Sequence, residues 1–121
     1  MKPIPMEQWQ WFGNAGHLCV ASRCRHHLCT KVGDYLVSTV GEFYARDNDA
    51  KPTTIGCDRT YETFVFEAGS PCECGCGLPG MGSDEIDTLP ANDAKTANAN
   101  HMAMCRKYAA IKPAKKRRAG K

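Results

Sequence analysis

The chain has 121 residues, enough for one domain, and no part of it contains the roughly 18 consecutive apolar residues of a membrane-spanning helix. Its net charge of +3 is unevenly distributed: residues 106–121 hold eight of the 16 basic residues and no acidic one, which leaves residues 1–105 with a net charge of −5. An acidic body is a poor surface for phosphate groups, so any affinity for nucleic acid has to come from the C-terminal tail.

Eight cysteines in 121 residues are more than a chain of this size usually contains. The first residues lack the apolar run of a signal peptide, so we expect the protein to stay in the cytoplasm, where thiols remain reduced. Cysteines mixed with histidines in a reducing compartment indicate metal binding rather than a disulfide framework. The sequence therefore predicts zinc as a cofactor.

Residues 1–70 are expected to form the core of a small antiparallel β-sheet with three strands or more. Residues 25–32 and 35–44 are rich in apolar and β-branched side chains and flank Gly33-Asp34, which is typical of a hairpin. A third strand is expected over residues 59–67, where apolar and polar side chains alternate. We thus predict an α+β fold in which the sheet is completed by a C-terminal helix.

The predicted helix spans residues 94–110 and is capped by Asn92 or Asp93. Its apolar stripe has helical spacing and consists of Ala97, His101, Met104, Cys105 and Tyr108. Residues 71–111 are accordingly expected to be a zinc-stabilised loop and helix packed on the sheet. Residues 112–121 are expected to be a disordered basic tail.

The aromatic cluster near the N-terminus comprises Trp9, Trp11 and Phe12, within a segment expected to form a short helix or strand. Closely spaced aromatic side chains can cover the core of a sheet, and this is the interpretation that we favour. The alternative is that they form an exposed surface that binds another molecule.

The principal metal-site prediction combines C-x-C-x-C at residues 72–76 with H-x-x-x-C at residues 101–105. Zinc prefers four thiolate or imidazole ligands at tetrahedral corners, and the intervening glycines allow a tight bend to bring thiolates together. His101 and Cys105 are four residues apart, so they lie on the same side of a helix. The predicted ligands are Cys72, Cys74, Cys76, His101 and Cys105, with three cysteines available for two of the positions. The alternative is that His101 and Cys105 are core residues.

A second cluster lies in the sequence GHLCVASRCRHHLCT, residues 16–30. A second zinc site there would use four ligands, His17, Cys19, Cys24 and His27. Core or surface positions for these residues are the interpretation that we favour over a metal site, because small free cysteines are commonly buried.

A catalytic interpretation of the same residues takes Cys24 or Cys19 as the nucleophile and His27 or His17 as the base. Asp58-Arg59 together with Tyr61 is a candidate orienting or anion-binding group. Their spacing selects no particular reaction. A zinc- or thiol-dependent hydrolase or nuclease that uses Cys24 and His27 therefore remains an alternative function.

The basic tail is the only part of the chain predicted to contact nucleic acid. Its candidate residues are Lys115, Lys116, Arg117 and Arg118. Such a segment binds phosphates weakly, without sequence preference and with a strong dependence on salt. The same residues could equally keep a small protein soluble.

Residues 11–42 (WFGNAGHLCVASRCRHHLCTKVGDYLVSTVGE), 55–66 (IGCDRTYETFVF) and 74–79 (CGCGLP) resemble a family of small Cys/His-rich phage and prophage proteins that have no assigned function. The resemblance implies expression in the cytoplasm of a bacterial host. Family members often have Phe where this chain has His26, which implies that His27 is the better candidate for a functional role.

The predicted function is that of a zinc-stabilised phage accessory protein. It would act as a non-enzymatic binding module on a host or phage protein, or on nucleic acid through its tail, and without any membrane association. Besides the hydrolase or nuclease, a further alternative is an inhibitor of a bacterial defence system.

Overall fold

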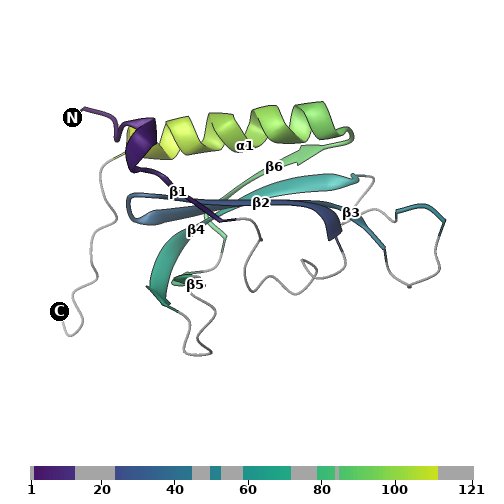
Figure 1. Ribbon diagram of the computed structural model, residues 1–121, viewed down its shortest axis with the longest axis horizontal. Helices are drawn as coiled ribbons and strands as arrows, with labels where there is room; N and C mark the ends of the chain where they lie inside the picture. Colours follow the sequence, from purple (N-terminus) through teal and green to yellow (C-terminus); the bar gives the residue numbers. More distant parts are fainter. Residues whose placement is uncertain are drawn as a thin grey trace.

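The computed structural model describes residues 2–12, 24–44, 50–52, 59–71, 79–83 and 85–111. In these residues one helix lies across one face of a twisted β-sheet (Figure 1). The protein is therefore α+β, with a largely antiparallel sheet and a C-terminal helix, as the sequence predicts. The described elements are η1 (Met6–Gln8), β1 (Gln10–Phe12), β2 (Cys24–Val32), β3 (Tyr35–Phe43), β4 (Tyr61–Pro71), β5 (Pro79–Met81), β6 (Asp87–Ala91) and α1 (Ala94–Ala109).

The sheet follows the order β1-β2-β3-β4, and every neighbouring pair is antiparallel. On its other side β4 pairs with β6 along its first half and with β5 near its end. Neither β5 nor β6 was predicted. β6, with the sequence DTLPA, is short and contains a proline, so it lacks a recognisable alternating pattern, and pairing with β4 is what makes it a strand.

The β2–β3 hairpin turns at Gly33-Asp34, as the sequence predicts. Gly33 has φ +60°, a conformation that glycine adopts without steric cost and that two-residue hairpin turns require. A Cβ atom at this position would also lie 2.6 Å from Cδ1 of Ile4. The turn therefore needs glycine for its backbone and for its contact with the N-terminal segment.

Helix α1 begins at Asp93, whose side chain accepts a 2.7 Å hydrogen bond from the backbone N–H of Thr96. The predicted apolar stripe is confirmed, because all five of its residues are buried against the sheet. Arg106 and Lys107 occupy the last turn, where positive charge interacts favourably with the helix dipole.

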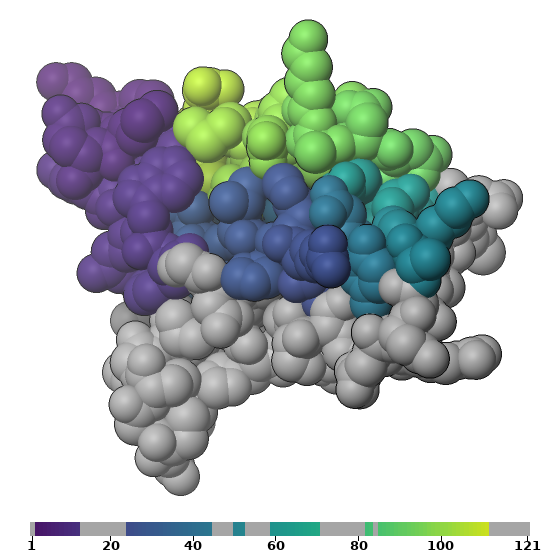
Figure 2. Space-filling view, turned by 45° about the vertical axis from the view of Figure 1, so that its right-hand side comes forward, coloured from purple at the N-terminus to yellow at the C-terminus, as the bar shows by residue number. Residues whose placement is uncertain are grey.

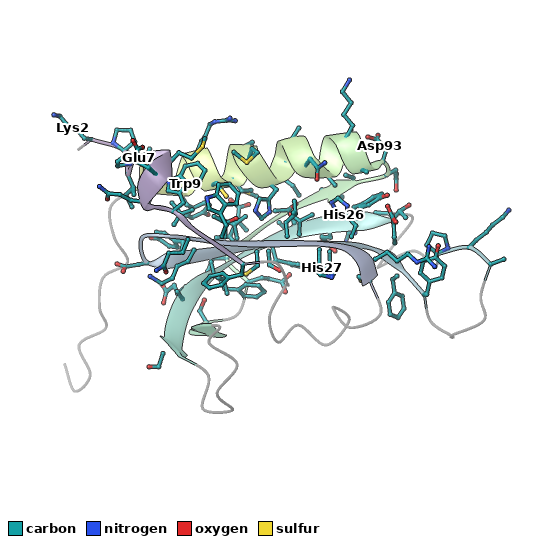
Figure 3. The ribbon with its side chains drawn as sticks, viewed as in Figure 1. Lys2, Glu7, Trp9, His26, His27 and Asp93 are labelled. Carbon is teal, nitrogen blue, oxygen red and sulfur yellow. The ribbon has the colours of Figure 1, made fainter. Side chains whose placement is uncertain are left out.

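The sheet has an apolar cluster on each of its faces. On the α1 side Val32, Val37 and Val65 pack against Met104 and Tyr108. On the opposite side a smaller cluster consists of Cys29, Leu36 and Phe66. Figure 3 shows this two-sided arrangement through neighbouring histidines of β2, since His26 lies on the α1 side and His27 on the other.

Gly41 allows Tyr61 to lie flat across the middle of the sheet. The two residues are directly opposite each other on β3 and β4, and a Cβ atom at Gly41 would lie 2.1 Å from the Tyr61 ring. The ring thus covers a backbone position that no larger residue could occupy.

We expect Gly41→Ala to destabilise the protein by about 2 kcal/mol or more, because the buried ring would have to move out of its packed position. Urea unfolding measures the loss. The same substitution in a Tyr61→Ala background serves as the control, since it should cost much less once the ring is absent. Equal costs in the two backgrounds would show that the ring is not the reason for the glycine.

Candidate functional site

His101 lies at the centre of the interface between α1 and the sheet and is 1% exposed. Its Nε2 atom is 2.8 Å from the hydroxyl of Thr30 on β2, and its Nδ1 atom is 2.7 Å from the hydroxyl of Thr39 on β3. Thr39 continues to Thr63 on β4 through a 2.8 Å hydrogen bond. One histidine therefore links the helix to three strands.

All hydrogen bonds of this network can form together only if each group donates to the next one in the same direction along it. A neutral imidazole donates from one nitrogen and accepts at the other, so one of its two threonines donates to the ring while the other accepts from it. Burial, with a further contribution from the His26 ring, lowers the pKa of His101 from 6.5 to about 4. The ring is consequently neutral at physiological pH, and neither nitrogen keeps a free lone pair.

The two hydrogen bonds of His101 limit its part in the predicted zinc site. Cys72, Cys74 and Cys76 lie outside the described residues, so the site itself stays a prediction. In the described part of the chain, no group of three or more His, Cys, Asp or Glu side chains is arranged to hold a metal ion. His101 could bind a metal only by giving up one of its threonine hydrogen bonds, and Cys105 is fully buried beside the same network.

The three described cysteines are buried free thiols. Burial raises the pKa of Cys105 to about 12, although a hydrogen bond from Thr30 acts in the opposite direction. Burial also raises the pKa of Cys29 to about 12, with a further contribution from Cys105. The pKa of Cys24 is raised by burial as well, against a lowering effect of its hydrogen bond with the Gly41 backbone. A nucleophilic cysteine needs the opposite shift.

The structure separates Cys24 from His27. Cys24 is the first residue of β2 and not part of a loop, and alternation along the strand places residues three apart on opposite faces. His27 therefore faces away from α1, and Cys24 is on the side of His26 instead. His17, Cys19 and Asp58 lie outside the described residues, so the remainder of the second zinc site and of the catalytic hypothesis stays a prediction.

Sequence reasoning missed a polar cluster formed by His26, Glu42 and Tyr61. The Tyr61 hydroxyl donates a 2.5 Å hydrogen bond to Oε2 of Glu42, and the rings of His26 and Tyr61 meet edge to face at 5.3 Å. Glu42 has φ +55°, the only positive value among the described residues other than glycine. Such strain is often found at functional positions.

The chemistry available to this cluster is limited. Burial, and then the hydrogen bond to Glu42, raise the pKa of Tyr61 to about 12, so its hydroxyl acts as a hydrogen-bond donor and not as a base. Nε2 of His26 is buried and has no hydrogen-bond partner among the described residues. The sequence offered Tyr61 as a candidate orienting or anion-binding residue, but no pattern in it pairs Tyr61 with His26 or Glu42.

The most exposed apolar side chains of the described residues are in or near the N-terminal segment. Trp11 is 51% and Met6 46% exposed, whereas Trp9 is buried with its ring 5.8 Å from that of Trp11. The expected aromatic cover over the core is therefore formed by Trp9, while Trp11 faces solvent. Figure 2 shows residues 2–12, in purple, projecting at one side of the molecule beside the end of α1.

Lys115, Lys116, Arg117 and Arg118 lie outside the described residues, and nucleic-acid binding by the tail stays a prediction. In the described part of the chain there is no helix of the length and apolarity that crossing a membrane requires. No family model, curated protein or solved structure matches the chain. The similarity to phage proteins is thus untested, and function has to be argued from the residues themselves.

The low pKa of His101 makes stability dependent on pH. Between pH 6.5 and about 4 the unfolded chain binds a proton at this residue that the folded protein does not bind. Its contribution is therefore complete above pH 6.5 and decreases as the pH falls towards 4. The difference between the two pKa values corresponds to about 3 kcal/mol of unfolding free energy, measurable by urea unfolding across this range.

The control is His101→Gln, since a glutamine amide can donate and accept hydrogen bonds without titrating. We expect the variant to be less stable at pH 7 but to lose less stability on acidification than the parent. An identical dependence on pH in both proteins would assign the effect to other groups.

Proposed function

We propose that this protein is a non-enzymatic binding module that captures an extended segment of a partner protein at the edge strand β1. The observation that supports this most directly is the exposure of Trp11 on that strand. Three large apolar side chains of the described residues are more than a third exposed, and two of them, Met6 and Trp11, are within six residues of each other. Tryptophan and methionine are both enriched at protein interfaces.

The strand itself is suited to receive another strand. In the described sheet β1 pairs only with β2, so its outer edge has no strand partner there. Proteins commonly protect such edges with charged residues or proline, but β1 has the sequence Gln10-Trp11-Phe12. An added strand would gain backbone hydrogen bonds, and Trp11 would supply a broad apolar contact.

The environments of the described cysteines and histidines argue against the enzymatic alternative. The described thiols have raised pKa values, Cys24 and His27 are on opposite faces, and the His26–Tyr61–Glu42 cluster includes no activated nucleophile. The partner would be a host or phage protein if the resemblance to phage proteins holds. Inhibition of a defence system would then be one consequence of such binding.

We also propose that zinc stabilises the segment between β4 and β6, bound by thiolates of Cys72, Cys74 and Cys76. Three cysteines within five residues support this proposal, and zinc bound in this way contributes about 10–16 kcal/mol in small peptides. A role for His101 and Cys105 as the remaining ligands requires His101 to exchange one threonine for the metal.

Trp11→Ala should abolish capture of the partner from bacterial lysate while leaving the melting temperature almost unchanged, because the side chain is half exposed. The measurement is affinity capture with quantitative mass spectrometry, combined with native mass spectrometry to detect self-association. Ile86→Ala is the matched control, since Ile86 is 45% exposed at a different position.

A protein that the parent and both variants capture equally does not bind through β1. If no captured protein is lost on Trp11→Ala, the proposal is contradicted. A dimer that Trp11→Ala dissociates would identify a second copy of this chain as the occupant of the edge instead of a different protein.

For zinc, native mass spectrometry of the purified protein should show one ion per chain. The double substitution Cys74→Ser with Cys76→Ser should remove it, whereas Cys29→Ser should retain it, because Cys29 packs with Leu36 and Phe66. His101→Gln decides the remaining ligand: loss of zinc supports its role, and retention limits His101 to the threonine network. A metal-free parent protein would refute the zinc proposal.

A further inference from the structure

A small pocket lies where the end of α1, the N-terminal segment and the β2–β3 turn meet. Ile4, Val32 and Ile111 contribute apolar walls, and the rings of Tyr35 and Tyr108 form the remainder of the lining together with the turn. Its volume of about 60 Å³ accommodates roughly two water-sized groups. The pocket therefore suits the end of a side chain better than a whole metabolite.

The two tyrosines give the pocket an aromatic corner. Their ring centroids are 4.8 Å apart and the ring planes are inclined by 60°. Faces of aromatic rings attract cations, and Nζ of Lys107 already lies 5.5 Å from the centroid of Tyr108. Both rings line the pocket, so a second cation inside it would lie next to them.

The one charged residue among the described residues that line the pocket is Asp34. It makes no ion pair with any described residue. Burial raises the pKa of Tyr35, and the carboxylates of Glu67 and Asp34 raise it further, which shows that both charges act at this ring. Of the nearby lysines, Lys107 is paired with Asp87 at 2.7 Å, and Lys31 donates to the Gly33 carbonyl at 2.8 Å.

We propose that this pocket binds the ammonium or guanidinium end of a lysine or arginine side chain of a partner protein. The cation would lie against the rings of Tyr35 and Tyr108 with Asp34 as its counter-ion, and the methylene groups would contact Ile4 and Ile111. Charge complementarity identifies the occupant, since the Asp34 carboxylate acts on the Tyr35 ring and makes no ion pair with a described residue, which favours a cation over a neutral apolar group. The inference does not depend on strand addition at β1.

The test uses n-butylammonium chloride, which reproduces a lysine side chain, and 1-butanol as its neutral counterpart. Each is titrated into the full-length ¹⁵N-labelled protein at constant ionic strength and followed by NMR. We expect saturable shifts of the amides of Val32, Gly33 and Tyr35, with affinity for butanol about three- to tenfold lower, the range expected for a partly desolvated cation–aromatic contact.

Asp34→Asn should reduce the affinity for butylammonium towards that for butanol while leaving the butanol affinity unchanged. Glu85→Gln is the matched control, because it also removes one carboxylate, from an exposed position outside the pocket lining. Equal affinities for the two ligands in the parent protein would define an apolar pocket and overturn the proposal. So would an absence of saturable shifts, or a butylammonium affinity that Asp34→Asn does not change.

Discussion

The structure depends on one neutral histidine that joins its only described α-helix to the middle of the sheet. The α1 side of the sheet has three buried threonines, Thr30, Thr39 and Thr63, where a sheet of this size would usually have aliphatic side chains. Their hydroxyls lose water on folding and need partners inside the protein. His101 is the partner of Thr30 and Thr39, and Thr63 pairs with Thr39. Because both ring nitrogens are used, the ring fixes the position of α1 relative to β2 and β3.

This use of His101 changes the interpretation of the other reactive residue types. Thiols and imidazoles suggest catalysis or metal binding when they are exposed and activated, but here burial raises the pKa of each described cysteine. By contrast, large apolar side chains of the described residues remain exposed, Trp11 and Met6 foremost. Recognition by contact is therefore better supported than chemistry by a thiol, and zinc, if it is bound, serves stability.

The spacing of apolar residues predicted the strands and the helix because it depends only on residues close together in the sequence. The alternation at Tyr61, Thr63 and Val65 and the stripe through Met104 and Tyr108 both describe one face of one element, and both are confirmed. Spacing also places His101 and Cys105 together, yet it cannot say what they face. Thr30 and Thr39 meet the ring from two strands, and Thr63 joins through Thr39 from a third, only because of the register of the sheet. The conformation of Glu42 and the pairing of β6 likewise depend on partners distant in sequence.

The N-terminal segment connects the two proposed recognition surfaces. Its first anchor is at Ile4, whose backbone N–H donates a 2.9 Å hydrogen bond to Ala109 at the end of α1, beside the pocket. The buried Trp9 ring (Figure 3) then donates through Nε1 to the Ile4 carbonyl at 3.1 Å. Trp11 follows on the edge strand β1. A segment held in this way at the helix end and at β2 is already ordered before any partner arrives. A partner that used both proposed surfaces would meet them in a fixed relation, which would lower the entropic cost of binding both at once.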